Sequence, residues 1–438
     1  MVSAWPFRLF IYLINGVIII NIIRTRGSGQ RIPCEWWNQA YRSAQGNRNC
    51  RMGICAFKHH LIDTGLPADR RYAQVAVADL DNCGTPEYIV GQTRGDIFCY
   101  KMDAPDSWRR FTLGVESPSD VGGAALDVDR DGWVDFVAGG AWYRNSRDVT
   151  TPFERIVFDP DLCAVHDLFV ADIDGDGRRD VVTMSDKNNL RWYRIPDDPA
   201  QPWERHDIGP AVHAGVAIGD IDGDGDLDIV RTDVWFENVR GDGTEWVTHP
   251  TGPSSEPPDD FRPRFAFNAT RCVLRDMTGN GSLDIVLCDA EIPGGKIWWM
   301  ENVAGDGSRW ERHEIALPAS PRRGAYHGMV VEDFDNDGDW DVFASEMEDV
   351  GGERPPRHYL WENVDGRGRE WREHVILDEN LGGHDPIAIR PNATTVPGII
   401  TKPWHAGPRN ALGGGMFVMY LEPRPGSRVD TRIREDET

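Results

Sequence analysis

Short segments with a strand-like pattern recur throughout residues 56–424. In each segment apolar and polar positions alternate, or β-branched residues run together, and clusters of Gly, Asp and Asn separate one segment from the next. Three types recur: an aromatic–polar–aliphatic segment such as Trp310–Ile315, a small-apolar segment ending in an acid such as Ala214–Asp220, and a Trp/Asn segment such as Ile297–Asn302. Segments this short, with this period, indicate β-strands rather than helices.

The segments recur in sets that predict a closed ring. With the strand that follows each acid-rich motif, a repeat holds four strands, and a repeat of roughly 45 to 57 residues is typical of a propeller. The segment Phe57–Ile62 precedes the first repeat, whereas the last repeat ends at its third strand, Met416–Leu421. We therefore predict an all-β, seven-bladed propeller of four-stranded antiparallel blades over residues 56–424, in which Phe57–Ile62 supplies the outer strand of the last blade.

Acid-rich loops follow the small-apolar segments. Asp172–Asp180 (DIDGDGRRD) has carboxylates at positions one, three, five and nine. These charges repel one another unless a hard divalent cation neutralises them, and Ca²⁺ accepts six to eight oxygen ligands with flexible geometry. An EF-hand is excluded because it needs Glu at position twelve, where this loop has Thr183, and flanking helices.

Three further loops keep all four acids, so we predict about four structural Ca²⁺ sites. Residues 79–87 and 276–284 are weakened copies, and residues 390–398 in the last repeat have lost the loop. The predicted metal ligands are Asp127, Asp129, Asp131, Asp135, Asp172, Asp174, Asp176, Asp180, Asp220, Asp222, Asp224, Asp228, Asp333, Asp335, Asp337 and Asp341.

Composition narrows the class of partner. The formal net charge is −24, from 47 Lys and Arg against 71 Asp and Glu. Such a chain is a poor candidate for nucleic acid, whose affinity comes from phosphate neutralisation. The eight cysteines show no CxxC spacing, and buried free thiols are the simplest interpretation, although Cys272 and Cys288 could face each other across two strands.

The ends of the chain lie outside the repeats. Leu9–Ile23 is an apolar run flanked by Arg8 and Arg24. Its length favours a signal peptide over residues 1–30, with an uncleaved membrane anchor or a mis-assigned translation start as alternatives. Residues 31–55 form an unassigned leader, and residues 425–438 a charged tail that we predict to be disordered. We expect the protein to be secreted or extracellular-facing, and monomeric.

Strand order predicts where a ligand site lies. Because blade strands run antiparallel, the starts of the innermost strands lie on the face opposite the acid loops, which makes the cations structural by default. Innermost strands line the central channel, so their first residues converge on one mouth: Tyr72, Asp120, His166, His213, Arg271, His327 and His384. Lys187, Trp404 and His405 lie in loops on the same face. These groups could fill a wet channel, hold a metal through the histidines, or form a catalytic or sugar-binding cluster.

The DxDxDG loops, the W-x-E-N strands and the W-x-x-H-x-I strands resemble the FG-GAP/VCBS repeat family of seven-bladed calcium propellers. Stretches such as SPSDVGGAALDVD and TMSDKNNLRWY are most similar to its sugar-active branch of rhamnose–glucuronate lyases and aldos-2-ulose dehydratase. That resemblance implies a carbon–oxygen lyase acting on an acidic poly- or oligosaccharide by β-elimination. His166, His213, His327 and His384 would then serve as base or acid, Arg271 would bind the carboxylate, and Tyr72 would exchange a proton. Asp120, Lys187, Trp404 and His405 would bind substrate.

Two alternatives use the same fold. A lectin or adhesion module would have the same mouth without turnover, with Trp404 as a stacking platform. A scaffold would have no ligand there, although a pure scaffold has no need of convergent histidines. Fold alone does not decide between them.

Overall fold

The computed structural model describes residues 8–14, 17–23, 53–252, 270–290, 292, 294–316, 321–348, 352–391, 396–407 and 410–428. The chain divides into two units, Met1–Met52 and Gly53–Thr438. In the first, β1 (Arg8–Ile14) and β2 (Val17–Ile23) form an antiparallel ribbon. The predicted signal peptide or anchor falls partly on this ribbon, and the rest of it, with most of the predicted leader, lies outside the described residues. No helix in the described residues is both long and apolar enough to cross a membrane.

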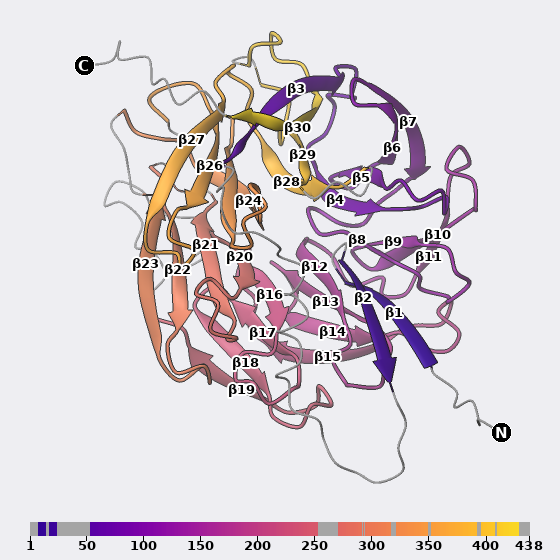
Figure 1. Ribbon diagram of the computed structural model, residues 1–438. Coiled ribbons are helices and arrows are strands. Elements are labelled where there is room, and N and C mark those ends of the chain that lie inside the picture. Colours follow the sequence, from indigo (N-terminus) through magenta and orange to yellow (C-terminus); the bar gives the residue numbers. More distant parts are fainter. Residues whose placement is uncertain are drawn as a thin grey trace, which may run out of the picture. The chain divides into compact units, whose positions relative to one another are not determined.

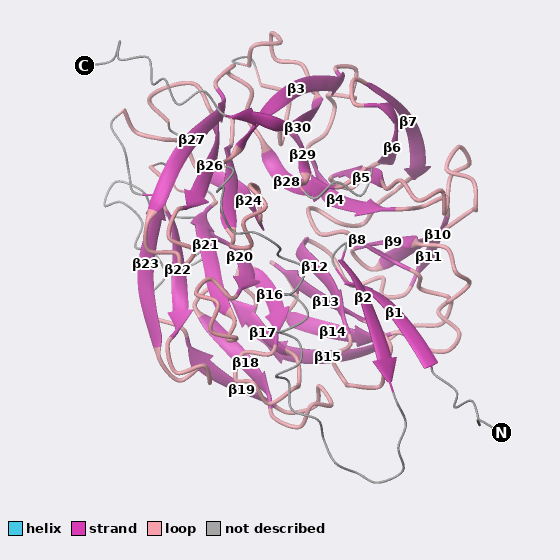
Figure 2. Ribbon diagram, in the orientation of Figure 1, coloured by secondary structure: helices cyan, strands magenta, loops and turns pink. Residues whose placement is uncertain are grey.

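The second unit confirms the predicted all-β propeller. Its described residues contain strands and no helix, arranged as seven four-stranded antiparallel sheets around a ring (Figures 1 and 2). The first and second strands of each blade, counted outward from the channel, are joined by the acid loop in the first six blades. The innermost strands are β4 (Tyr72–Ala78), β8 (Ala124–Leu126), β12 (Val165–Ala171), β16 (Val216–Gly219), β20 (Thr270–Arg275), β24 (Tyr326–Glu332) and β28 (His384–Ile389). The second strands are β5 (Glu87–Gln92), β9 (Asp135–Ala138), β13 (Asp180–Ser185), β17 (Asp228–Arg231), β21 (Asp284–Asp289), β25 (Asp341–Glu346) and β29 (Gly398–Lys402).

The third and fourth strands complete each blade. The third strands are β6 (Ile97–Ala104), β10 (Ala141–Arg144), β14 (Leu190–Arg194), β18 (Val234–Asn238), β22 (Ile297–Asn302), β26 (His358–Asn363) and β30 (Val418–Arg428). The outer strands are β7 (Ser107–Gly114), β11 (Glu154–Val157), β15 (Glu204–Gly209), β19 (Trp246–Pro250), β23 (Trp310–Ala316), β27 (Trp371–Leu377) and β3 (Cys55–Asp63).

The ring closes as predicted, between the two ends of the propeller. Strand β3 pairs antiparallel with β30 to complete the seventh blade, and each innermost strand contacts the next around the ring, β28 and β4 included. The pairing runs further than the sequence indicates, because Arg428 lies opposite Cys55. Residues 425–428 of the predicted disordered tail are therefore part of β30, and residues 429–438 lie outside the described residues.

The core consists of apolar layers between neighbouring blades. Second strands such as β13 and β21 are buried along their whole length, whereas outer strands alternate between exposed and partly buried positions. One layer joins Val286 and Trp299 of the fifth blade to Val342 and Trp361 of the sixth. This explains the sequence pattern, since strands covered on both faces read as continuous apolar runs and the outer strand keeps a polar face. The six described cysteines are free, in line with the free-thiol interpretation.

The Trp and Asn residues of the third strand connect successive blades. The Asn302 amide donates backward to the Ile221 carbonyl in the fourth blade's acid loop (2.8 Å), as Asn238 does to Ile173 (2.9 Å). The Trp299 indole donates forward to the Gly368 carbonyl of the sixth blade (3.0 Å). The third strands β10, β18 and β22 thus bond to both neighbouring blades through these two residues, which is a physical reason for the repeated tryptophan and asparagine.

We expect Asn302→Ala to lower the free energy of unfolding by about 3 kcal/mol. The change removes the bond to Ile221, leaves the Gly307 N–H without its acceptor, and leaves the Gly305 N–H only the backbone carbonyl of residue 302. Urea denaturation followed by tryptophan fluorescence measures the effect. Arg240→Ala, at an exposed ion pair with Asp242, is the matched control and leaves the midpoint unchanged. A midpoint for Asn302→Ala equal to the control's would show that the connection carries no stability.

Candidate functional site

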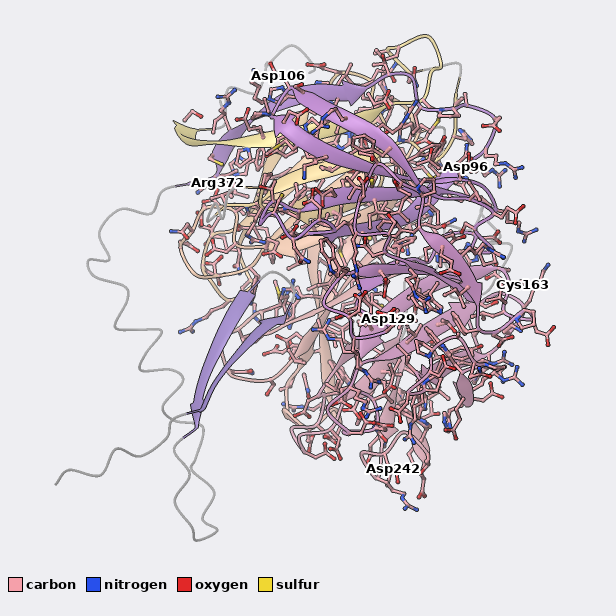
Figure 3. All side chains as sticks on the ribbon, turned by 90° about the vertical axis from the view of Figure 1, so that its right-hand side faces the viewer. Asp96, Asp106, Asp129, Cys163, Asp242 and Arg372 are labelled. Atoms are coloured by element: carbon pink, nitrogen blue, oxygen red, sulfur yellow. The ribbon has the colours of Figure 1, made fainter. Side chains whose placement is uncertain are left out.

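The acid loops and the histidines lie at opposite ends of the blades. In the third blade Val165 is paired with Ser185 at one end of β12, and Ala171 with Asp180, the last acid of the loop, at the other. At about 3.3 Å per residue the His166 end is roughly 17 Å from the loop. Figure 3 shows this from the side: Cys163, just before β12, lies at the right edge and Asp129, in the second blade's acid loop, lies further left. The mouth is the channel end lined by the first residues of the innermost strands.

Irregular backbone at the mouth changes the direction in which side chains leave the innermost strands. Register shifts occur at the start of four innermost strands: between Tyr72 and Val75, Val165 and Asp167, Tyr326 and Met329, and His384 and Ile387. A bulge leaves residues unpaired and bends the strand, so that a side chain leaves the regular alternation. Asp385 lies in such a bulge with a φ of 47°, a conformation that non-glycine residues rarely adopt. Strain of this kind concentrates at functional sites.

Arg271 spans the channel. From β20 in the fifth blade it donates to Asp167 in the third blade (2.8 Å) and to Asp385 in the seventh, neither of which adjoins the fifth blade. Burial by itself raises the pKa of both carboxyl groups, but the histidine beside each one and the Arg271 charge outweigh it and lower both pKa values. Its guanidinium is thus committed to internal carboxylates, which argues against the predicted role of Arg271 as the clamp for a substrate carboxylate.

His384 and Asp385 form a dyad beside Lys402. Nδ1 of His384 lies 2.7 Å from Asp385 and 3.0 Å from the Lys402 ammonium. Nδ1 can donate to the carboxylate or accept from the ammonium, which only donates, but it cannot do both; Nε2 is the proton acceptor in the tautomer whose Nδ1–H donates to Asp385. Burial keeps the pKa of His384 well below 6.5 and lowers that of Lys402 to about 8. At neutral pH the imidazole is therefore neutral.

A stack of aromatic and cationic groups runs outward from this dyad. His327 stacks on His384 with ring centroids 4.0 Å apart, and His384 stacks on Trp404 at 4.6 Å. The Arg71 guanidinium lies over the Trp404 ring, 5.6 Å from its centroid. Trp404 is held by its backbone N–H, which donates to Glu348 (2.6 Å). The order His327, His384, Trp404, Arg71 leads from buried residues to an exposed cation.

A second histidine pair lies at the mouth. His166 and His213 have ring centroids 4.2 Å apart, and Nδ1 of His213 lies 2.8 Å from the Asp186 carboxylate. His166 is nearly fully buried, and burial lowers its pKa. The structure therefore brings the four predicted histidines together as two pairs, each beside an aspartate.

The remaining predicted site residues are held by local contacts. The Tyr72 hydroxyl is buried, donates to the Pro67 carbonyl (2.8 Å) and accepts from Gln92 (3.0 Å), which does not favour proton exchange with a ligand. Asp120 is paired with Arg94 (3.0 Å). Lys187 is exposed in the β13–β14 turn, and His405 lies 3.8 Å from Glu348.

Sequence reasoning missed Asp167, Asp385, Lys402 and Arg71. Three signals were available: both aspartates follow a histidine as the dipeptide HD, at the same point of two repeats, and Arg71 precedes Tyr72. Lys402 carries no signal of its own, because only the pairing of His384 with Lys402 across two strands places it there.

Three kinds of residue cluster could hold a metal, and one of them, Glu301, Glu311 and His313 in the fifth blade, has Arg369 against two of its members. At the mouth, ligand atoms of His327, His384 and Asp385 lie within 4.8 Å of one another, but the Lys402 ammonium lies in the same cluster. In the acid loops, ligand atoms of Asp172, Asp174 and Asp180 are equally close.

The acid loops fit a hard cation by their donor set. In four of the six loops both oxygens of the position-nine carboxylate accept backbone N–H groups, as Asp228 does from Ile221 (2.9 Å) and Asn238 (2.9 Å). Burial, followed by the charges of the other loop carboxylates, raises the pKa of Asp135, Asp180 and Asp228 to about 7. A bound divalent ion would offset this repulsion. Ca²⁺ binding at these loops stays a prediction.

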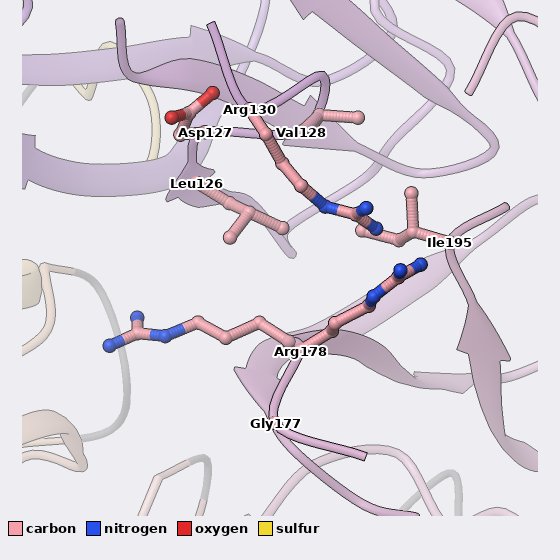
Figure 4. Close-up of a pocket in the computed structure, with 8 residues that line it drawn as sticks. Leu126, Asp127, Val128, Arg130, Gly177, Arg178 and Ile195 are labelled. Carbon is pink, nitrogen blue, oxygen red and sulfur yellow. The ribbon is translucent and has the colours of Figure 1, made fainter. Parts of the chain in front are cut away.

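A pocket of about 330 Å³ lies on the acid-loop face, away from the mouth (Figure 4). Leu126, Val128 and Ile195 are among its lining residues, together with Arg130 and Arg178. Both arginines reach Asp197, at 3.6 and 2.7 Å, so their charges are partly compensated within the protein.

Comparison with known proteins supports the repeat and the fold. The model of the FG-GAP-like repeat matches residues 172–230 and 276–344, so the chain contains FG-GAP-like repeats in the third to sixth blades. A search of curated proteins finds no match. Among solved structures, BBS1N in complex with ARL6DN, soaked with mercury, has a TM-score of 0.50 at 9% identity and covers 85% of this chain and 99% of that chain.

Two further solved structures are similar. The lead-soaked crystal of the same complex has a TM-score of 0.49 at 9% identity, with 85% and 99% covered. YCF48 bound to D1 peptide has a TM-score of 0.47 at 13% identity, with 85% and 98% covered. At such identities the likeness is one of fold alone.

We expect Arg271→Met to lower the free energy of unfolding by about 3–5 kcal/mol, because it leaves Asp167 and Asp385 buried without their shared cation. Chemical denaturation measures the change. Adding Asp385→Asn to Arg271→Met should recover part of the loss, and Arg94→Met, which breaks a more exposed pair with Asp120, should change little. Equal stability of Arg271→Met and wild type would contradict the role of Arg271 as a clamp across the channel.

Chelation should lower the melting temperature by several degrees if divalent ions occupy the acid loops. Ligand that binds only the folded state at 100 times its dissociation constant stabilises by about 2.7 kcal/mol. Differential scanning fluorimetry with EDTA, followed by excess Ca²⁺, measures the loss and its recovery. Since the loops lie away from the mouth, ligand binding there should decline only as the fold is lost.

Proposed function

We propose that this protein is a secreted, carbohydrate-active propeller that cleaves a uronate-containing glycan by β-elimination at the mouth of its central channel. The observation that carries the proposal is the Asp385–His384 dyad, with a neutral imidazole, in line with the Trp404–Arg71 platform. Buried charged groups are costly to bring together, and perturbed titratable groups of this kind mark functional sites.

The proposed reaction needs three groups. A base removes the proton at C5, the C–H electron pair forms the C4=C5 double bond, and the C4–O pair leaves with an oxygen that takes up a proton. Nε2 of His384 suits the base in the tautomer whose Nδ1–H donates to Asp385. His213, backed by Asp186 and partly exposed, suits the acid that protonates the leaving oxygen.

Binding of the substrate carboxylate falls to Arg71 in this scheme. Arg71 is exposed and lies over Trp404, so its guanidinium can pair with a carboxylate while the indole stacks on the sugar ring. Pairing of the carboxylate withdraws charge from C5 and stabilises the enolate-like transition state. Lys187 and His405 would contribute only further along the bound chain.

Glycan binding without turnover is the second candidate function. His384 is 1% exposed and His327 is 3% exposed, which favours imidazoles that support Trp404 from behind over imidazoles that touch a substrate. The solved BBS1N structure holds a partner, ARL6DN, so the fold by itself leaves the class of ligand open.

The test is absorbance at 235 nm, where unsaturated uronate ends absorb, on a panel of acidic plant and algal glycans. We expect product from at least one glycan, a loss of 100-fold or more in kcat with His384→Ala, and a raised KM with Arg71→Ala. His206→Ala, on the outer strand β15, is the matched histidine control. Binding that survives His384→Ala without any product selects the second function, and absence of both binding and product overturns the proposal.

A further inference from the structure

One position in the third strand divides the blades into two classes. In six blades the residue after position nine of the acid loop pairs with a residue of the third strand, and the position meant here is the next residue of that third strand. The pairs are Tyr88 with Tyr100, Phe136 with Tyr143, Val181 with Tyr193, Ile229 with Phe236, Ile285 with Met300, and Val342 with Trp361. The position itself is therefore equivalent in all six and lies beside position nine. It is basic in the first three blades, as Lys101, Arg144 and Arg194, and acidic in the next three, as Glu237, Glu301 and Glu362.

The three basic side chains all enter the acid loop of their own blade, and all meet the same carboxylate. Lys101 contacts Asp81, Nε of Arg144 lies 3.1 Å from Asp129, and Arg194 contacts Asp174. Each of these aspartates is position three of its loop. A lysine or arginine placed there supplies positive charge to the carboxylates that a divalent ion would neutralise.

The three acidic residues bond to the outer strand of their blade. Each accepts a hydrogen bond from a histidine of the outer strand: Glu237 from His249 (2.7 Å), Glu301 from His313 (2.9 Å) and Glu362 from His374 (2.8 Å). Glu301 and Glu362 also pair with Arg369 (2.6 Å) and Arg372 (3.0 Å). The third strand in these blades therefore supplies no cation to the position-three carboxylate of the loop.

The sixth blade shows an unfilled requirement for a cation. Its loop has five aspartates, because Asp339 adds to the four repeated positions. Asp335, at position three, is only 7% exposed, and one of its carboxylate oxygens is buried without a hydrogen-bond partner. Asp129 and Asp174 also have such an oxygen, but an arginine lies beside each of them, whereas Asp335 has no ion-pair partner among the described residues. A buried carboxylate oxygen without a donor is destabilising unless a cation pairs with it.

We propose that the loop of the sixth blade is a divalent-cation site for a hard, oxygen-seeking ion such as Ca²⁺, and that in the first three blades a third-strand lysine or arginine replaces the ion. The four loops with complete acid sets are then not equivalent. An ion entering the second or third blade must displace Arg144 or Arg194 from Asp129 or Asp174, whereas an ion entering the sixth blade meets Asp335 directly. This inference is independent of the proposed function at the mouth.

Two tryptophans make the loops distinguishable. Trp340 occupies position eight of the sixth blade's loop and Trp133 position seven of the second blade's loop. Tb³⁺ binds the same carboxylate oxygens as Ca²⁺, and its emission is sensitised by an indole within a few ångströms. Excitation of tryptophan therefore reports which loop holds the ion.

The experiment titrates the chelator-stripped full chain with Tb³⁺. We expect Trp340→Phe to remove most of the sensitised emission at low Tb³⁺ and Trp133→Phe to change it little. Asp335→Asn should remove the Trp340-dependent emission, and excess Ca²⁺ should compete it away. Arg144→Gln should produce new emission that disappears on adding Trp133→Phe.

The outcomes that overturn the proposal are equally specific. Emission in the wild-type chain that depends on Trp133 as much as on Trp340 would show that Arg144 does not replace an ion. So would an Arg144→Gln chain whose Trp133-dependent emission does not rise. The phenylalanine variants keep an aromatic side chain and Arg144→Gln keeps a polar one at partly exposed positions, so they remain interpretable if Asp335→Asn fails to fold, and circular dichroism checks each chain.

Discussion

The hydrogen bonds of the position-nine carboxylate hold the architecture together. In the second, fourth, fifth and sixth blades one oxygen accepts the N–H of position two and closes the loop, and the other accepts the N–H of an asparagine at the end of the third strand, as Asp284 does from Met277 (2.9 Å) and Asn302 (2.8 Å). In the second, fourth and fifth blades the asparagine amide then reaches the preceding blade. One buried carboxylate thus couples a tight turn, a strand pair and a blade-to-blade contact. Because it recurs, the acid loops gather on one face and leave the other for the mouth.

At the mouth the ion pairs cross the channel, whereas the contacts of the acid loops join neighbouring blades around the ring. Arg271 joins blades that are not neighbours, through Asp167 and Asp385. Each of those aspartates also positions a histidine next to it in the sequence. Arg271 therefore already donates to carboxylates within the protein. In the proposed reaction the exposed Arg71, rather than Arg271, binds the carboxylate of the substrate.

The sequence was a good guide to the fold and a partial guide to the site. Period, strand type and the displaced Phe57–Ile62 segment predicted seven blades and their closure, since each depends on local pattern. Strand order predicted that the histidines converge. It could not show that Lys402 lies beside His384, because that contact depends on a cross-strand pair, nor that Asp385 turns toward Arg271, because that depends on a bulge. The four complete acid loops read alike, and only the strand register revealed that Arg144 and Arg194 enter two of them.

Ring closure has a consequence for the order of synthesis. His60 of β3 contacts Glu422 of β30, which lies 362 positions further along the chain. At about 5–20 residues per second, a ribosome needs roughly 20–70 s to deliver the second of these strands after the first. During that interval the first propeller strand made has no partner, and the inner blades can assemble only as an open arc. Release of the carboxyl-terminal residues from the ribosome, rather than the fold of any one blade, then sets the earliest moment at which the nascent protein can become complete.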